Sequence, residues 1–137
     1  MQHMLAVNPI PIVDLFAGPG GLGEGFSSLN NGVTFKIVVS AEMETSAHQT
    51  LRLRAFYRIL KKQGDNSLSD YYNFCNGETN APYSKHTQKY WLEAGEEAQQ
   101  LTLGNDQDNL KLISIIEKAK LNETTPWVLI GGPVELH

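Results

Sequence analysis

The sequence predicts an α/β fold, in which a parallel sheet is covered by helices. Short apolar runs that are typical of buried strands occur at residues 12–16, 34–40, 101–103 and 127–130. Helical periodicity or helix-forming composition fills most of the chain between them. Strands that alternate with helices favour a parallel sheet with right-handed crossovers, and we expect four strands in that arrangement.

Length and composition predict one domain over residues 1–137, with a packed core. Hydrophobic residues make up 41% of the chain and charged residues 19%, which excludes wholesale disorder. The net charge of −4 lacks the basic excess of a free-standing DNA-binding domain. One cysteine excludes an internal disulfide. No apolar stretch has the length of a membrane span, and no signal peptide is visible, so we expect a cytoplasmic protein.

The stretch at residues 12–26 is the centre of the prediction. A strand between Pro11 and Gly18 runs into a turn that contains five glycines and then into a helix that ends near Leu29. This order places backbone N–H groups at a helix N-terminus, where they can donate hydrogen bonds to the polar parts of a nucleotide-like ligand. We therefore expect a binding site at this turn.

A turn at residues 30–32 ends this helix, and the second strand covers residues 34–40. Thr45 or Ser46 is expected to cap the next helix, whose apolar face repeats every four residues. The other faces of this helix are basic and indicate either a solvated surface or a contact with a DNA backbone: Arg52, Arg54, Arg58, Lys61 and Lys62.

The second half begins with an expected insertion at residues 63–100. Residues 63–83 lack a clear period and predict a long loop, and residues 84–100 predict a helix. A short third strand at 101–103 should lead through a turn at 104–106 to a helix at 109–120. The fourth strand, residues 127–130, is followed by Gly131, Gly132 and Pro133.

Two ligand classes fit the glycine turn when it is considered alone. Gly18, Gly20 and Gly23 satisfy the dinucleotide pattern G-x-G-x-x-G, and Glu42 lies near the expected position of a ribose-binding acid. A nicotinamide or flavin oxidoreductase is therefore one interpretation. Since a carboxylate after the second strand accepts hydrogen bonds from any ribose, Glu42 does not separate that interpretation from other nucleoside ligands.

The longer string from Asp14 to Gly21 resembles the first motif of the DNA cytosine-5 methyltransferases, Asp-Leu-Phe-Ala-Gly-x-Gly-Gly, and the match continues to Phe26. The resemblance implies a Rossmann-like methyltransferase fold that binds S-adenosylmethionine or S-adenosylhomocysteine. It places Phe16 against the adenine and wraps the turn around the methionine portion, which involves Ala17, Gly18, Gly20, Gly21 and Leu22.

Two further segments are similar to family motifs that bind the cofactor. Residues 40–44 resemble the second motif, which implies that Glu42 binds the ribose hydroxyls and that Met43 packs on the adenine. The family often has an aromatic residue at the Met43 position. The turn at 104–106 is a candidate for the third motif, whose acid accepts from the adenine amino group. Either Asn105 or Asp106 would make that contact, and Asp106 is alternatively a helix cap.

The segment from Val128 to Pro133 resembles the approach to the family's catalytic Pro-Cys-Gln, where a thiolate attacks C6 of a flipped-out cytosine and C5 takes the methyl group. Glu135 occupies the cysteine position, and a carboxylate is too poor a nucleophile to replace the thiolate. Cys75 lies in the insertion without a basic neighbour that would lower its pKa. We therefore predict no catalytic residue and no metal ligand in this chain.

These motifs lead us to expect the cofactor-binding part of a restriction-modification type enzyme, truncated after the fourth strand. DNA would be the partner of the whole enzyme, with little or no DNA binding by this part. An unpaired strand at 127–130 would favour self-association. A non-catalytic module that retains the cofactor pocket stays open as an alternative.

Overall fold

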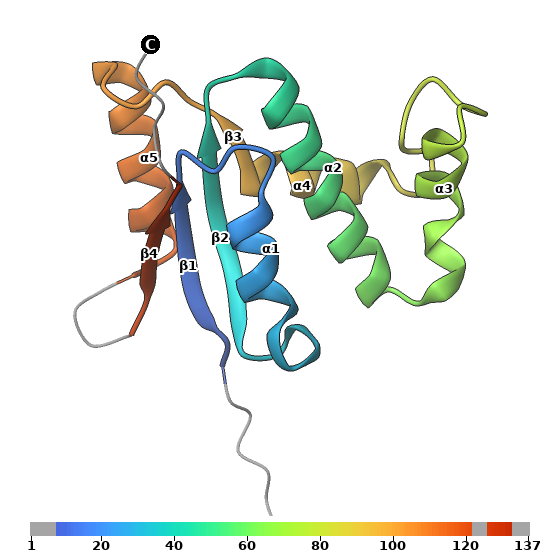
Figure 1. Cartoon of the computed structure of the whole chain (residues 1–137), viewed down its shortest axis with the longest axis horizontal. Coiled ribbons are helices and arrows are strands. Elements are labelled where there is room, and N and C mark those ends of the chain that lie inside the picture. Colours follow the sequence, from blue (N-terminus) through green and yellow to red (C-terminus); the bar gives the residue numbers. More distant parts are fainter. Residues whose placement is uncertain (1–7, 122–125, 133–137) are drawn as a thin grey trace, which may run out of the picture.

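The computed structural model describes residues 8–121 and 126–132 (Figure 1). Glu135 and Pro133 therefore lie outside the described residues. The strands are β1 (Ile10–Leu15), β2 (Phe35–Glu42), β3 (Ala98–Gln100) and β4 (Val128–Gly131). The helices are α1 (Gly21–Ser28), η1 (Leu29–Gly32), α2 (Thr45–Lys62), η2 (Asp65–Leu68), α3 (Ser69–Cys75), α4 (Gln88–Glu97) and α5 (Asp106–Lys118), of which η1 and η2 are short 3-10 helices.

The four described strands form a parallel sheet in the order β3-β2-β1-β4, which confirms the α/β prediction. From β1 the chain adds β2 and β3 on one side and then crosses to add β4 on the other side. The carboxyl ends of all four strands lie at one edge, which is the upper edge in Figure 1. In sheets of this kind, ligands bind outside the carboxyl ends where the strand order reverses, here beside β1 and β4.

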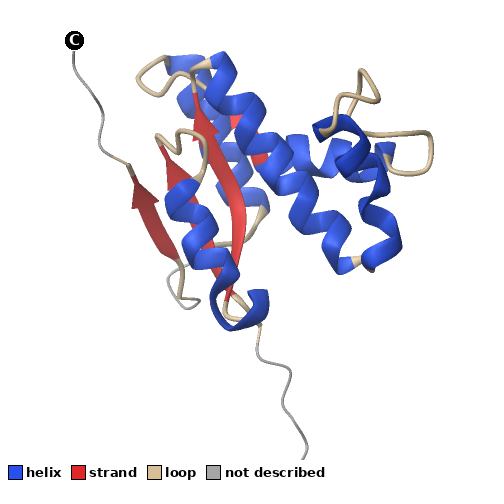
Figure 2. Cartoon of the chain, turned by 45° about the vertical axis from the view of Figure 1, so that its right-hand side comes forward, coloured by secondary structure: helices blue, strands red, loops and turns tan. Residues whose placement is uncertain are grey.

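Helices cover both faces of the sheet. Helices α1 and α2 lie on one face and α5 on the other (Figures 1 and 2). Val13 and Val39 point towards α5 and form a core cluster with Leu112. Because side chains alternate along a strand, the neighbouring Asp14 points the other way, towards Gly23 of α1.

The expected insertion is more ordered than the sequence suggested. The prediction of a loop over residues 63–83 is wrong in part, since η2 and α3 form there. These short helices have no long amphipathic period, and they are stabilised by packing on α2 instead. A second core cluster shows this packing, with Phe56 and Leu60 of α2 against Leu68 and Ala94.

Helix α4 packs against α2 through contacts between Arg52 and Trp91. The Arg52 guanidinium lies 4.0 Å from the centre of the Trp91 ring, and two of its nitrogens donate to the Trp91 carbonyl at 2.8 and 3.2 Å. Tyr83 stacks on the same ring, with 5.8 Å between ring centres. Helices η2, α3 and α4 are therefore packed against α2 as a small helical layer beside the sheet (Figure 2).

Several element boundaries differ from the prediction. The third strand is Ala98–Gln100 and not 101–103, because Ala98 pairs with Ser40 in register while Leu101 enters the core from the following turn. Helix α4 is correspondingly shorter than the helix predicted over 84–100. Helix α5 begins at Asp106, three residues before the predicted start. The periodicity of apolar residues does not indicate where the capped ends of α4 and α5 lie.

Among the described helices, α2 and α5 have side-chain N-caps, and both caps differ from the predicted residues. Glu44, not Thr45 or Ser46, caps α2, and its carboxylate accepts from the backbone N–H groups of Ser46 at 3.2 Å and Ala47 at 2.7 Å. Asn105 caps α5 in the same way. The helix end predicted at residues 30–32 is confirmed, since all three residues have positive φ.

None of the helices in the described part of the chain is long and apolar enough to cross a bilayer.

Candidate functional site

The glycine turn at residues 16–20 connects the carboxyl end of β1 to α1 (Figure 1). Gly18 and Gly20 have φ angles of +58° and +95°, a region that glycine enters without strain. Phe16 has φ +52°, which costs energy in a residue with a bulky side chain. Its side chain is nevertheless 44% exposed and so does not serve the core. A strained backbone that presents an exposed aromatic ring is typical of a ligand-contacting residue.

Glu42 joins the turn after β2 to the turn after β1. Its Oε1 accepts from the Gly18 N–H at 3.0 Å, and its Oε2 accepts from the Glu44 N–H at 2.8 Å. The Ala17 N–H also donates to the Ala41 carbonyl at 3.0 Å. Each carboxylate oxygen has two acceptor positions, so Glu42 retains capacity for two hydroxyl donors from a ligand.

The N-terminus of α1 faces the same edge of the sheet. Its N-cap, Gly20, supplies no side-chain hydrogen bond, so the N–H groups of the first turn lack a side-chain cap. The Cα of Gly21 has open space around it, and the Leu22 side chain is exposed. These features leave a positive helix end open towards solvent, where it favours an anionic group of a ligand.

Met43 directly follows β2, and Asp106 begins α5, whose N-terminal end lies at the same edge of the sheet as the carboxyl ends of the strands (Figure 1). The Met43 side chain is 63% exposed, and its carbonyl accepts from Gln100 Nε2 at 3.2 Å. Asp106 is the exposed first residue of α5. Because Asn105 supplies the cap, its side-chain oxygen is already engaged by α5. The Asp106 carboxylate makes no hydrogen bond to the glycine turn among the described residues.

Asp14, which the sequence identifies only as part of a motif, is a buried polar residue in the structure. It is 1% exposed, and neither carboxylate oxygen has a hydrogen-bond partner among the described residues. Burial raises its pKa from 3.8 to about 6. A Cβ at Gly23 would lie 2.8 Å from Asp14 Oδ2, so this position needs glycine. The signal that could have found Asp14 is a lone acid inside an apolar run, Ile12–Val13–Asp14–Leu15.

The glycine pair after β4 has a structural reason. A Cβ at Gly131 would lie 3.1 Å from the Leu15 carbonyl oxygen, and a Cβ at Gly132 would lie 3.1 Å from the Phe16 carbonyl oxygen. The pair therefore lets the end of β4 approach the end of β1 and the turn that follows it. This approach brings the segment that resembles the fourth motif next to the glycine turn.

The structure places Cys75 away from the glycine turn. Cys75 is exposed at the end of α3, and α3 lies on the far side of the insertion from the glycine turn (Figures 1 and 2). Within residues 8–121 and 126–132, no cluster of three or more His, Cys, Asp and Glu side chains is placed to hold a metal ion. The prediction for Glu135 cannot be followed in the structure, since that residue is outside the described part.

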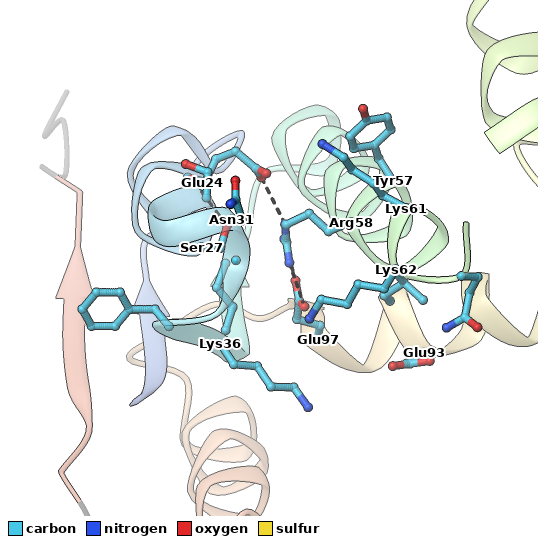
Figure 3. Close-up of a pocket in the computed structure, with 16 residues that line it drawn as sticks. Glu24, Ser27, Asn31, Lys36, Tyr57, Arg58, Lys61, Lys62, Glu93 and Glu97 are labelled. Carbon is cyan, nitrogen blue, oxygen red and sulfur yellow. Dashed lines mark hydrogen bonds and ion pairs between the residues drawn. The ribbon is translucent and has the colours of Figure 1, made fainter. Parts of the chain in front are cut away.

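A cavity of about 630 Å³ lies at the opposite end of the molecule, between the ends of α1 and α2, the start of β2 and helix α4 (Figure 3). Arg58 spans it, with bonds to Glu97 at 2.8 and 3.1 Å and to Glu24 at 3.2 Å. Burial lowers the pKa of Arg58, but its hydrogen bonds and charge pairs with Glu97 and Glu24 outweigh this and leave it above the ordinary value. This network ties three helices together.

The basic face of α2 is thus partly internal. Arg52 and Arg58 are engaged by the protein itself, which removes them from the group of cations that was considered for DNA contact. Lys61 and Lys62 are exposed at the end of the helix, where cations complement the helix dipole. The cavity that Arg58 spans is distinct from the predicted cofactor site, because the glycine turn lies at the other end of the strands.

Comparison with known proteins supports a relation to methyltransferases. The chain is 44% identical over 57 residues to the type II methyltransferase M.Bpa9945I of Bacillus paralicheniformis. The aligned segment covers 42% of this chain and 12% of that protein, so the chain spans a small part of the length of this relative. No family model and no solved structure matches the chain. The similarity favours a methyltransferase over an oxidoreductase and extends no further.

Proposed function

We propose that this chain forms the S-adenosylmethionine-binding part of a DNA cytosine-5 methyltransferase of the restriction-modification type. The observation that carries the proposal is the bond between Glu42 and Gly18, which joins the two turns that resemble the first two family motifs. An open helix N-terminus and an exposed, strained Phe16 lie at the same place. The partial similarity to a type II methyltransferase supports the same reaction class.

The described residues fit the cofactor in chemical terms. S-adenosylmethionine supplies an activated methyl group. The protein must hold its adenine, its ribose and its methionine portion. Glu42 has acceptor capacity for the ribose hydroxyls, and the exposed Phe16 and Met43 side chains offer apolar surface for the adenine. The Asp106 carboxylate is the acceptor that we assign to the adenine amino group. Gly18 and Gly21 leave open space for the methionine portion beside Ala17 and Leu22, and Gly20 lets the turn pack closely on Leu51.

We further propose that this chain binds the cofactor without transferring the methyl group. The step requires a thiolate that attacks the cytosine ring, and Cys75 is remote from the glycine turn. Binding of the target base and recognition of DNA belong, in this proposal, to other parts of a complete enzyme. Methyl transfer to DNA by this chain alone would contradict the second proposal but leave the first intact.

Titration calorimetry tests the binding proposal. We expect S-adenosylmethionine and S-adenosylhomocysteine to bind with one-to-one stoichiometry, while NAD and FAD produce no heat of binding. The matched comparison is Glu42→Ala against Glu78→Ala, an exposed acid in the insertion, and only the first change should weaken binding. Folded protein that binds neither adenosyl compound would overturn the proposal. Binding of NAD instead would establish the oxidoreductase interpretation.

A further inference from the structure

Two buried polar side chains lie directly behind the glycine turn. Asp14 of β1 and Ser40 of β2 are paired in register and are 1% and 0% exposed. Neither Asp14 oxygen nor the Ser40 hydroxyl has a hydrogen-bond partner among the described residues. A buried polar atom without a hydrogen-bond partner lowers the stability of the fold. Such a group in a packed sheet therefore indicates a role other than stabilising the core.

Asp14 forms no ion pair with a described cation. From α2, Arg54 reaches the glycine turn, where its Cδ lies 3.6 Å from a Cβ built at Gly20. On β2, the nearest charged residue on the same face is Glu42, whose oxygens accept from backbone N–H groups. On α1, Glu24 pairs with Arg58 and not with Asp14. On β4, the residue opposite Asp14 is Ile130, which is apolar. The electrostatic field that favours the Asp14 carboxylate comes from the N-terminal turn of α1, where Gly23 lies against Asp14.

We propose that Asp14 determines cofactor specificity, by favouring the positively charged methyl donor S-adenosylmethionine over its neutral product S-adenosylhomocysteine. This inference rests on the proposed function. The two compounds share adenosine and the amino-acid group, and they differ in the methyl group and the positive charge of the sulfonium. A carboxylate that is shielded from water acts on that charge through space, because a buried environment screens it little. Asp14 is a positioning charge here and not a catalytic residue.

The ionisation of Asp14 makes the proposal testable by pH. Burial raises its pKa to about 6, so the group is a carboxylate above this pH and neutral below it. The carboxylate attracts the sulfonium, and the neutral acid does not. The preference for S-adenosylmethionine should therefore be present above pH 6 and decline as the pH falls through 6. Groups that both compounds contact cancel in the ratio of the two affinities.

The experiment is calorimetry with both compounds, at pH 8 and at pH 5, on the wild-type chain, Asp14→Asn and Glu78→Gln. The last variant removes one negative charge from an exposed site in the insertion. At pH 8 we expect Asp14→Asn to reduce the affinity ratio by about tenfold, equivalent to one pKa unit, and Glu78→Gln to leave it unchanged. Wild-type protein at pH 5 should behave like Asp14→Asn.

The outcomes separate this inference from the proposed function. If both compounds bind and the ratio is the same in all three proteins and at both pH values, Asp14 has no role in specificity and the inference is wrong. If neither compound binds to folded wild-type protein, the proposed function is wrong and the inference falls with it. Should Asp14→Asn not fold, the wild-type pH series decides alone, since a ratio that is independent of pH contradicts the inference.

Discussion

Glu42 Oε1 accepts a hydrogen bond from the Gly18 N–H at 3.0 Å, and this bond links residues that are 24 positions apart in the chain. It makes the carboxyl ends of β1 and β2 one structural unit. The same carboxylate supports the glycine turn and, in the proposed function, binds the ribose. Any change at Glu42 should therefore affect both the shape of the turn and the affinity for the ligand.

Removal of the Glu42 carboxylate should weaken cofactor binding strongly. Glu42→Ala loses hydrogen bonds from ribose hydroxyls to a charged acceptor, each of which contributes about 1.5–3 kcal/mol, or roughly 10- to 100-fold in affinity. Glu42→Gln keeps one acceptor oxygen and should give an intermediate loss. Calorimetry with S-adenosylhomocysteine measures both.

Glu44 provides the control for this series, since its side chain caps α2 and its backbone N–H donates to Glu42. Glu44→Ala should lower the free energy of unfolding by about 1 kcal/mol, as expected for a lost N-cap, with little change in affinity. If Glu42→Ala and Glu44→Ala weaken binding equally, the ribose contact assigned to Glu42 is wrong.

The glycines of the turn and of α1 should respond differently to substitution by alanine. Gly20 has φ +95°, and an added Cβ would lie 2.8 Å from Leu51 Cδ1. Gly20→Ala should therefore lower the free energy of unfolding by about 1–2 kcal/mol. Gly25 lies inside α1 with open space around it, so Gly25→Ala should raise stability by about 0.5–1 kcal/mol. Urea denaturation of both variants checks the contrast, and destabilisation of similar size in both would contradict it.

Arg58 should be a major contributor to stability. Its side chain is 18% exposed and is bonded to Glu24 of α1 and Glu97 of α4. Arg58→Ala leaves two partly buried carboxylates without their partner, a change that costs about 3 kcal/mol. Lys61→Ala, on the exposed side of the same helix, should change stability by less than about 0.5 kcal/mol. Thermal or urea unfolding followed by circular dichroism distinguishes the two, and equal stability of both variants would show that the network is not stabilising.

Self-association through β4 remains a prediction. Among the described residues β4 pairs only with β1, and its Leu129 side chain is 58% exposed. An open apolar edge pairs with other chains, whereas lysine on an edge prevents this. We expect sedimentation to show concentration-dependent association that Leu129→Lys abolishes. Leu92→Lys, at an exposed position on α4, should leave it unchanged. A wild-type chain that stays monomeric at high concentration would contradict the prediction.

Much of the sheet and of the glycine turn could be predicted because the signals are local. Apolar runs place β1, β2 and β4, and a run of glycines after a strand indicates a tight turn whatever the rest of the chain does. The strand at Ala98–Gln100 could not be placed, since its residues are strand-forming only through pairing with β2. Helix α3 could not be predicted for a related reason. It is stabilised by packing on α2 and has no apolar periodicity of its own.

The sequence by itself determined the fold class, the position of the glycine turn and the motifs that suggest a methyl donor, since each depends on residues close together in the chain. Only the tertiary structure showed that Glu42 holds Gly18, that Arg52 and Arg58 serve internal contacts, and that Asp14 is buried without a partner. Hydrogen bonding, ion pairing and desolvation depend on neighbours that are distant in sequence. They are therefore decided only when the sheet and its helices come together.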